Sequence, residues 1–287
     1  MNDYEVIDEP LTDTVETETD CLRISYATSR GYVRETNEDS FFVDGKCRHV
    51  FGMEENDCYT VPADGTHVFG IFDGMGGEAH GELASELSAT ALENAFERLT
   101  QAEPDRYGEL MDEFCQSANN AVLDMLKERG ESRGGSTFAA VCVRDGAAYT
   151  FYLGDSRVYL RGAGSAFTML TRDHTVAFSK LESGEYTEEQ ARTSRDRHAL
   201  MHFIGEDKQR SGLNAAECGA VPFGAGSVLV MCTDGLTDMA ADEEIAATLG
   251  KSRNPASALV ELALANGGRD NVSCIVIENL TKTEKKP

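Results

Sequence analysis

The chain has 287 residues, of which 41% are hydrophobic and 26% are charged, and its formal net charge is −24 at pH 7. This length and composition are typical of a globular protein with one large or two small domains. The negative charge argues against nucleic acid or anionic lipid as a partner, because phosphate-rich partners need a basic surface. The sequence opens without a signal-like apolar segment and holds no apolar run of membrane-spanning length. We therefore expect a cytoplasmic protein without membrane attachment.

The two ends of the chain differ in composition from the rest. Residues 1–20 hold eight acidic side chains, no Lys or Arg, and few large apolar residues. Such a segment buries too little apolar surface to fold by itself, so we predict an acidic, disordered N-terminal tail. Residues 281–287 are assigned to a C-terminal tail. Residues 21–280 show no internal repeat and no linker, which predicts a single domain.

The spacing of apolar residues predicts strands and helices along the chain. Alternation with polar residues indicates strands, and a spacing of about 3.6 residues indicates amphipathic helices. In chain order, the predictions are strands over 22–28, 41–43 and 68–72, helices over 83–99 and 110–126, strands over 137–143, 147–153 and 158–160, a polar excursion over 172–205, a strand over 228–232, a helix over 255–265 and a strand over 272–277. Groups of strands that alternate with two blocks of helices predict an α+β domain with layered antiparallel sheets.

Acidic residues recur where apolar strands end. These residues are Glu38, Asp39, Asp73, Asp155, Asp234 and Asp270. Unpaired carboxylates near a core are costly, so basic partners or cations must offset them, and few Lys or Arg lie beside them. Oxygen ligands without His or Cys favour magnesium or manganese over zinc. Two such ions a few ångströms apart could bridge a water molecule and activate it for attack on phosphorus.

Two positions strengthen this interpretation. Asp73 is followed by three glycines within four positions, so the backbone there can approach a ligand closely. Arg34, shortly before Glu38, is suited to bind phosphate oxygens in a bidentate manner. The alternative is that each acid caps a helix or forms a turn, a common role for Asp. For Asp39 taken alone, that alternative is at least as good.

Several motifs in a fixed order carry a resemblance to a known family. They are R-x-x-N-E-D, F-D-G-M-G-G, G-G-S-T, G-D-S-R-V-Y, L-T-R-D-H, C-T-D-G-L-T-D and G-R-D-N-V-S. Together they resemble the metal-dependent serine/threonine protein phosphatases of type 2C, in the bacterial style, over residues 25–277. The resemblance implies a four-layer α-β-β-α sandwich with two central antiparallel sheets. It also implies a metal site between the upper edges of these sheets.

The resemblance further implies how the acids hold two manganese or magnesium ions. Asp73 would bridge the two ions, and Asp234 and Asp270 would complete the ligands of one. The carbonyl oxygen of Gly74 would bind the other ion, with Glu38 nearby.

Further roles are implied for residues around these two ions. Asp39 would hold metal-bound water, and Asp155 would join Asp234 at a weak third ion. Arg34 corresponds to the phosphate-binding arginine. Residues 172–205 correspond to a flap that helps to choose substrates.

The chain departs from the family pattern at three places. Many members have a histidine at the position of Met75, where it is regarded as the proton donor to the leaving alcohol. Bacterial relatives commonly have methionine there and often a histidine after the two glycines, where this chain has Glu78, with His80 two residues later. The candidates for that acid are therefore metal-bound water first and His80 second. In the flap, His198 and His202 stand at unusual positions, and we expect them to pack within the flap instead of binding metal.

Residues and resemblance together predict a phosphatase that acts on phosphoserine and phosphothreonine in proteins. The predicted reaction is an in-line attack by metal-activated water, with Arg34 and the ions offsetting charge on the phosphoryl oxygens. We expect a monomer whose partners are proteins phosphorylated by a cytosolic serine/threonine kinase. The alternatives are a catalytically silent regulatory or binding module, which the intact ligand positions disfavour, and a phosphatase of a small metabolite.

Overall fold

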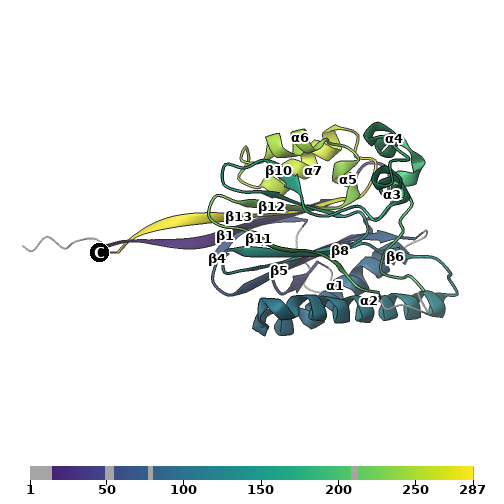
Figure 1. Ribbon diagram of the computed structural model, residues 1–287, viewed down its shortest axis with the longest axis horizontal. Coiled ribbons are helices and arrows are strands. Elements are labelled where there is room, and N and C mark those ends of the chain that lie inside the picture. Colours follow the sequence, from purple (N-terminus) through teal and green to yellow (C-terminus); the bar gives the residue numbers. More distant parts are fainter. Residues whose placement is uncertain (1–14, 49–54, 77–79, 208–212, 287) are drawn as a thin grey trace, which may run out of the picture.

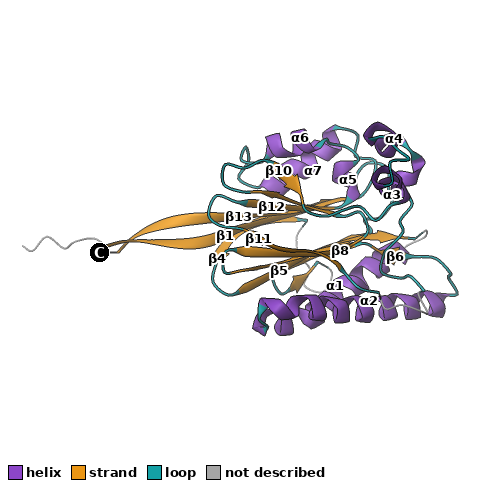
Figure 2. Ribbon diagram, viewed as in Figure 1, coloured by secondary structure: helices purple, strands orange, loops and turns teal. Residues whose placement is uncertain are grey.

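Two antiparallel sheets packed face to face form the centre of the molecule, and helices cover both outer faces (Figure 1). The computed structural model describes residues 15–48, 55–76, 80–207 and 213–286. Figure 2 shows the layers as purple helices above and below orange strands. The predicted α+β class and the four-layer α-β-β-α sandwich are confirmed.

Each sheet is built from strands that lie far apart in the sequence. In the first sheet the order is β10 (Phe167–Met169), β9 (Arg157–Arg161), β12 (Val228–Cys232), β13 (Val272–Lys286), β1 (Val15–Ser29) and β4 (Asn56–Pro62). In the second it is β11 (Ala216–Pro222), β8 (Ala147–Leu153), β7 (Phe138–Arg144), β5 (Thr66–Met75), β2 (Asp39–Val43) and β3 (Lys46–Cys47), with β6 (Gly135–Ser136) paired to β5. Tight turns join some neighbours, such as β7 and β8, so their predicted hairpin is confirmed.

The helices fall into three groups. Those over the second sheet are α1 (His80–Gln101), the 3-10 turn η1 (Pro104–Arg106) and α2 (Tyr107–Arg129). Those over the first sheet are α5 (Asp234–Thr237), α6 (Asp242–Thr248) and α7 (Pro255–Ala265). The segment 172–205 contains α3 (Val176–Glu182), α4 (Glu188–Thr193) and the 3-10 turn η2 (Arg195–His198). Among the described helices, none combines the length and apolar character needed to cross a bilayer.

The strand that leads to the predicted metal loop shows how the layers are held together. Along β5, Val68 and Phe72 pack in the core beneath α1 and α2. The intervening Phe69 and Ile71 pack in the core between the two sheets. Successive side chains of a strand point to opposite faces, so β5 anchors both cores. Full burial of each such side chain stabilises the fold by about 1.5–3 kcal/mol.

The ends of the central ladder differ from the predicted tails. β1 begins at Val15 and β13 ends at Lys286, and these two residues are partners in the register. Residues 15–20 and 281–286 are therefore strand residues, whereas both were assigned to tails. Valine and threonine at alternate positions from 15 to 19 favour a strand, a local pattern that the acidic composition obscured. Residues 1–14 and 287 of the predicted tails lie outside the described residues.

Candidate metal centre

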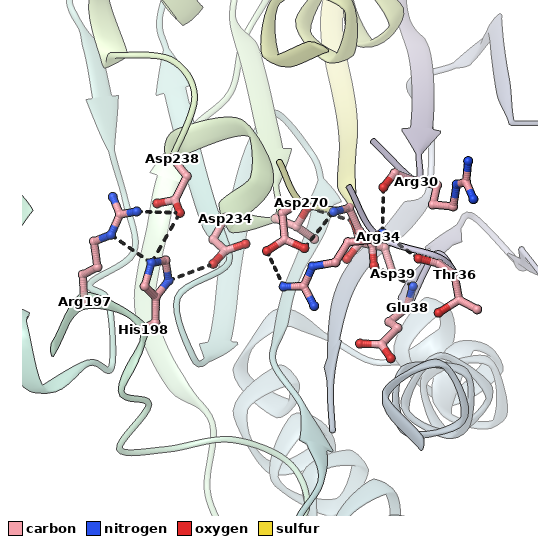
Figure 3. A network of polar contacts seen from close by, with 12 residues as sticks. Arg30, Arg34, Thr36, Glu38, Asp39, Arg197, His198, Asp234, Asp238 and Asp270 are labelled. Carbon is pink, nitrogen blue, oxygen red and sulfur yellow. Dashed lines mark hydrogen bonds and ion pairs between the residues drawn. The ribbon is translucent and has the colours of Figure 1, made fainter. Parts of the chain in front are cut away.

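The predicted acids lie at one end of the sandwich, each placed there by the element beside it. Asp39 begins β2 and is the register partner of Asp73 near the end of β5, so the two lie on the same face of the sheet. Asp155 lies between β8 and β9, where the chain turns. Asp234 begins α5 directly after β12, and Asp270 precedes β13. Figure 3 shows Asp39, Asp234 and Asp270 in the same part of the molecule, with Asp234 next to His198 and Asp270 next to Arg34.

The acids are close enough for their charges to act on one another. Loss of contact with water raises the pKa of Asp73 well above its usual range, and the charges of Asp234, Asp39, Asp155 and Asp270 raise it further. Burial likewise raises the pKa of Asp155, and the charge of Asp234 raises it further. Where neither a cation nor a basic side chain offsets these charges, the acids are stabilised by taking up protons.

Asp39 is fixed by two hydroxyl groups. Its Oδ2 accepts hydrogen bonds from Ser273 Oγ at 2.7 Å and from Thr233 Oγ1 at 3.0 Å. Burial raises the pKa of Asp39 to about 7 even though both hydrogen bonds oppose the shift. Its Oδ1 is buried and has no hydrogen-bond partner among the described residues. One oxygen is thus held in place while the other remains available to a ligand.

Asn271 organises the loop that carries Arg34. Its Nδ2 donates to the carbonyl oxygens of Arg30, at 3.0 Å, and Thr36, at 2.9 Å. Its Oδ1 accepts from the backbone N–H of Glu38 at 2.8 Å. The Arg34 side chain is half exposed, and its Nη2 donates to Asp270 Oδ2 at 2.7 Å (Figure 3). The guanidinium is therefore directed to the acidic cluster and accessible from solvent.

The Glu38 carboxylate and the Gly74 carbonyl face the same point at the start of α1. A methyl group added to Gly81 would lie 2.7 Å from Glu38 Oε2 and 2.9 Å from Gly74 O. The Glu38 backbone carbonyl accepts from Gly74 N at 3.2 Å and from Ser85 Oγ at 2.6 Å. Burial raises the pKa of Glu38, with Arg34 opposing. These two oxygens therefore lie close to each other beside the first turn of α1.

A second pair of hydroxyls connects the loops of Asp73 and Asp155. Thr137 bonds both backbone groups of Asp73: its N–H donates to the carbonyl at 2.9 Å, and its Oγ1 accepts from the N–H at 3.2 Å. The same Oγ1 is hydrogen-bonded to Ser156 Oγ at 2.7 Å. Ser156 follows Asp155 in the chain. The two loops are therefore tied at a fixed separation.

Sequence reasoning missed these supporting polar groups. The missed residues are Thr137, Ser156, Thr233, Asn271 and Ser273. Each lies within a quoted motif or directly after a predicted acid, but a hydroxyl or amide gives no signal of which carboxylate or backbone group it will bond. The structure does not identify the acid that protonates the leaving group. His80, one candidate, is partly buried at the start of α1. Glu78 lies outside the described residues.

The segment 172–205 contacts the acidic cluster through η2. His198 Nδ1 lies 3.8 Å from Asp234 Oδ2, and its Nε2 lies 3.7 Å from Asp238 Oδ2 (Figure 3). Arg197 Nη2 pairs with the same Asp238 oxygen at 3.2 Å. His198, Asp234 and Asp238 each place one ligand atom within 4.8 Å of the others. His198 was expected only to pack within the flap, but its ring also lies next to Asp234 and Asp238.

Comparisons with known proteins agree with this geometry. The sequence profile of the protein phosphatase 2C family matches residues 52–264. A putative protein phosphatase 2C-type from Streptococcus pyogenes is 30% identical over 73% of this chain and 84% of its own length. The serine/threonine protein phosphatase PstP of Mycobacterium tuberculosis is also 30% identical over 90% of this chain. The chain spans 45% of the length of that relative.

Solved structures have the same fold. The M. tuberculosis phosphatase superposes with a TM-score of 0.72 and 28% identity, over 90% of this chain and 98% of that one. A second structure, the catalytic domain of PstP in complex with two manganese ions, also has a TM-score of 0.72 and 28% identity, over 91% of this chain and 100% of that one. The resemblance noted in the motifs is thereby confirmed. This chain belongs to the protein phosphatase 2C family.

Proposed function

We propose that this chain is a metal-dependent phosphatase that removes phosphate from phosphoserine and phosphothreonine in proteins. The observation that carries this proposal is the cluster of acids around Asp73, in which burial and the charges of the neighbouring acids raise the pKa of Asp73 and of Asp155, with the Arg34 guanidinium at its edge. Anionic groups gathered around a cationic arginine suit a phosphate ester only if cations offset the acids. The named activities of the relatives support the same reaction class.

The residues present fit two manganese or magnesium ions. All of the predicted donors are oxygens, and Asp39 Oδ1 is a buried acceptor that no described group uses. We assign one ion to Asp73, Asp234 and Asp270, and the other to Asp73 and Gly74 O with Glu38 nearby. Asp155 and Asp234 would hold a weak third ion. When bound, such ions offset the charge of the phosphoryl group and lower the pKa of a water molecule that attacks phosphorus.

The chain's own groups orient the reactants. Arg34 is positioned to bind two phosphoryl oxygens, and its hydrogen bond to Asp270 holds the guanidinium at the site. Asp39, fixed by Ser273 and Thr233, is positioned to accept a hydrogen bond from the attacking water. The hydrogen bonds of the Asn271 side chain hold the Arg34 loop and Glu38 against the start of β13.

We also propose the setting in which this activity operates. The substrates would be proteins phosphorylated by a serine/threonine kinase, and the enzyme would act as a cytoplasmic monomer. The names of the relatives as serine/threonine phosphatases support the substrate class. The strongly acidic composition agrees with the absence of nucleic acid among the proposed partners.

Hydrolysis of p-nitrophenyl phosphate and of a phosphothreonine peptide, with manganese and with EDTA, tests the proposal. We expect turnover only with manganese. Asp73→Asn should lower kcat/KM by more than about 100-fold, because loss of a metal ligand should cost more than loss of a group that only supports a ligand, which costs up to about 100-fold. Asp145→Asn is the matched control, because Asp145 is exposed in the β7–β8 turn at φ +49°, which Asn tolerates. Equal turnover in EDTA, or full activity in Asp73→Asn, would contradict the proposal.

Calorimetric titration with manganese separates this enzyme from a silent binding module. We expect manganese to bind the unmodified chain and to bind Asp73→Asn more weakly. Peptide turnover must accompany that binding. A chain that binds manganese but hydrolyses neither substrate would favour the module.

A further inference from the structure

Large apolar side chains are exposed around the metal centre. Among the described residues, the exposed large hydrophobics are Tyr32, Val33 and Met201, with 70%, 68% and 43% of their surface accessible. Tyr32 and Val33 directly precede Arg34 in the chain. Single exposed apolar residues are ordinary on protein surfaces, but two adjacent ones beside a ligand-binding arginine mark a candidate contact surface.

Met201 belongs to a different segment, which is connected by backbone hydrogen bonds to the turn of Asp155. Its N–H donates to the carbonyl of His174 at 2.7 Å. The N–H of His174 in turn donates to the carbonyl of Gly154 at 2.9 Å, next to Asp155. These two hydrogen bonds connect the backbone of Met201 to the turn that carries Asp155.

The backbone of Tyr32 is fixed against the opposite loop. Its N–H donates to the carbonyl of Gly268 at 2.7 Å. A methyl group on Gly268 would lie only 3.0 Å from Tyr32 Cδ2, so the ring packs closely over that glycine. Gly31 has φ +74° and lies against the carbonyls of Gly268 and Asp270, where a side chain has no room. The aromatic ring is thus presented to solvent by an ordered loop, which lowers the entropy lost when a partner binds.

The reaction on a free phosphate ester does not need this surface. When a phosphoryl group is bound at Arg34, the substrate residues on either side of the phosphorylated one must lie near the loop that carries Arg34. The reason is that consecutive Cα atoms are only about 3.8 Å apart. We infer that Tyr32 and Val33 form a docking surface for an apolar side chain that flanks the phosphorylated residue of a protein substrate. This inference rests on the proposed phosphatase function. The charge of −24 disfavours an acidic flanking residue in the same place.

Matched phosphothreonine peptides test the inference on the manganese-loaded full chain. Each peptide carries leucine or glycine on both sides of the phosphothreonine. We expect kcat/KM to be about tenfold higher for the leucine peptide, which corresponds to about 1.4 kcal/mol. In the double variant Tyr32→Ser, Val33→Ser this preference should disappear while turnover of the glycine peptide remains. Tyr32→Phe, which keeps the ring, should retain the preference.

The comparison of the two peptides excludes a purely structural effect. A loop that had lost its shape would slow both peptides equally, and the melting temperatures of the variants would fall. The inference is overturned if the unmodified chain turns over both peptides equally, or if the leucine preference survives in the double variant. If the unmodified chain hydrolyses neither peptide with manganese, the proposed function itself fails and the docking surface falls with it.

Discussion

The support of Asp39 illustrates how single side chains set the chemistry of this centre. A carboxylate with a buried, unpartnered oxygen would ordinarily rotate or take up a proton. Ser273 and Thr233 prevent rotation because both donate to the same oxygen, Oδ2. The other oxygen, Oδ1, then keeps one direction. The role of Asp39 therefore depends on two residues that were not among the predicted site residues.

Replacement of Ser273 tests this dependence. We expect Ser273→Ala to lower kcat about 10- to 100-fold, the usual effect of losing a group that orients a metal-site residue. Affinity for manganese should change less, because Asp73, Asp234 and Asp270 remain. Steady-state kinetics at several manganese concentrations measures both effects.

The matched control is the neighbouring Ser40→Ala. Ser40 is buried, but its hydroxyl has no hydrogen-bond partner among the described groups. Its removal should leave kcat within about twofold and should not lower stability, since an unsatisfied buried hydroxyl is unfavourable. If Ser40→Ala and Ser273→Ala had the same effect on kcat, the specific role of Ser273 would be refuted.

At the level of the elements, the short strand β6 and the residue that follows it, Thr137, connect segments that are distant in the sequence. β6 pairs with the end of β5, and Ser136 also pairs with Ile204 at the end of the 172–205 segment. Thr137, the next residue, bonds Asp73 and Ser156. The two acid-bearing loops and the end of the proposed flap therefore share one support.

Replacement of Thr137 should loosen that support. We expect Thr137→Val to weaken manganese binding about tenfold, because its methyl groups cannot bond Asp73 N or Ser156 Oγ. Thr137→Ser keeps the hydroxyl and should bind manganese normally. Calorimetric titration measures the affinity.

Thr150→Val provides the control for the same chemical change. Thr150 is buried in β8, and its hydroxyl bonds no described group. Manganese affinity should be unchanged in this variant. Normal affinity in Thr137→Val would show that the hydroxyl pair does not position the loops.

For the whole molecule, the acidic cluster links folding stability to pH. Asp39 has a folded pKa of about 7, above the usual 3.8. In the metal-free protein, its stabilising effect is present below the unfolded pKa and is lost as pH rises through the folded one. Above that range the buried charge destabilises the fold.

Asp39→Asn isolates this contribution, because the amide has the same shape and does not ionise. In EDTA, we expect the variant to gain stability relative to the unmodified chain as the pH is raised from 4 to 8. Denaturant unfolding at several pH values measures the difference. A difference that did not change with pH would contradict the raised pKa. Added manganese should reduce the difference at pH 8, since cations offset the charge of the cluster.

The fold and the principal acids could be predicted from sequence because their signals are local. The apolar run of β5 reaches Asp73 near the end of the strand, and Asp234 begins α5 just after β12, so each acid is visible at the end of its own strand. The roles of Thr137 and Asn271 could not be predicted, because they depend on which distant backbone groups the folded chain brings near. The strand starting at Val15 was missed for a similar reason, since its partner is at the far end of the sequence.

The ladder of β1 and β13 has a practical consequence for engineering. Val15 and Lys286 are neighbours, and Figure 1 shows the ribbon that carries them extending away from the helices and from the body of the sandwich. A fluorescent label or affinity tag attached at either position would emerge at the same remote place. A short linker could also connect these positions, so that new ends could be opened at an exposed hairpin such as Asp145–Gly146 without cutting the segments that carry the predicted acids.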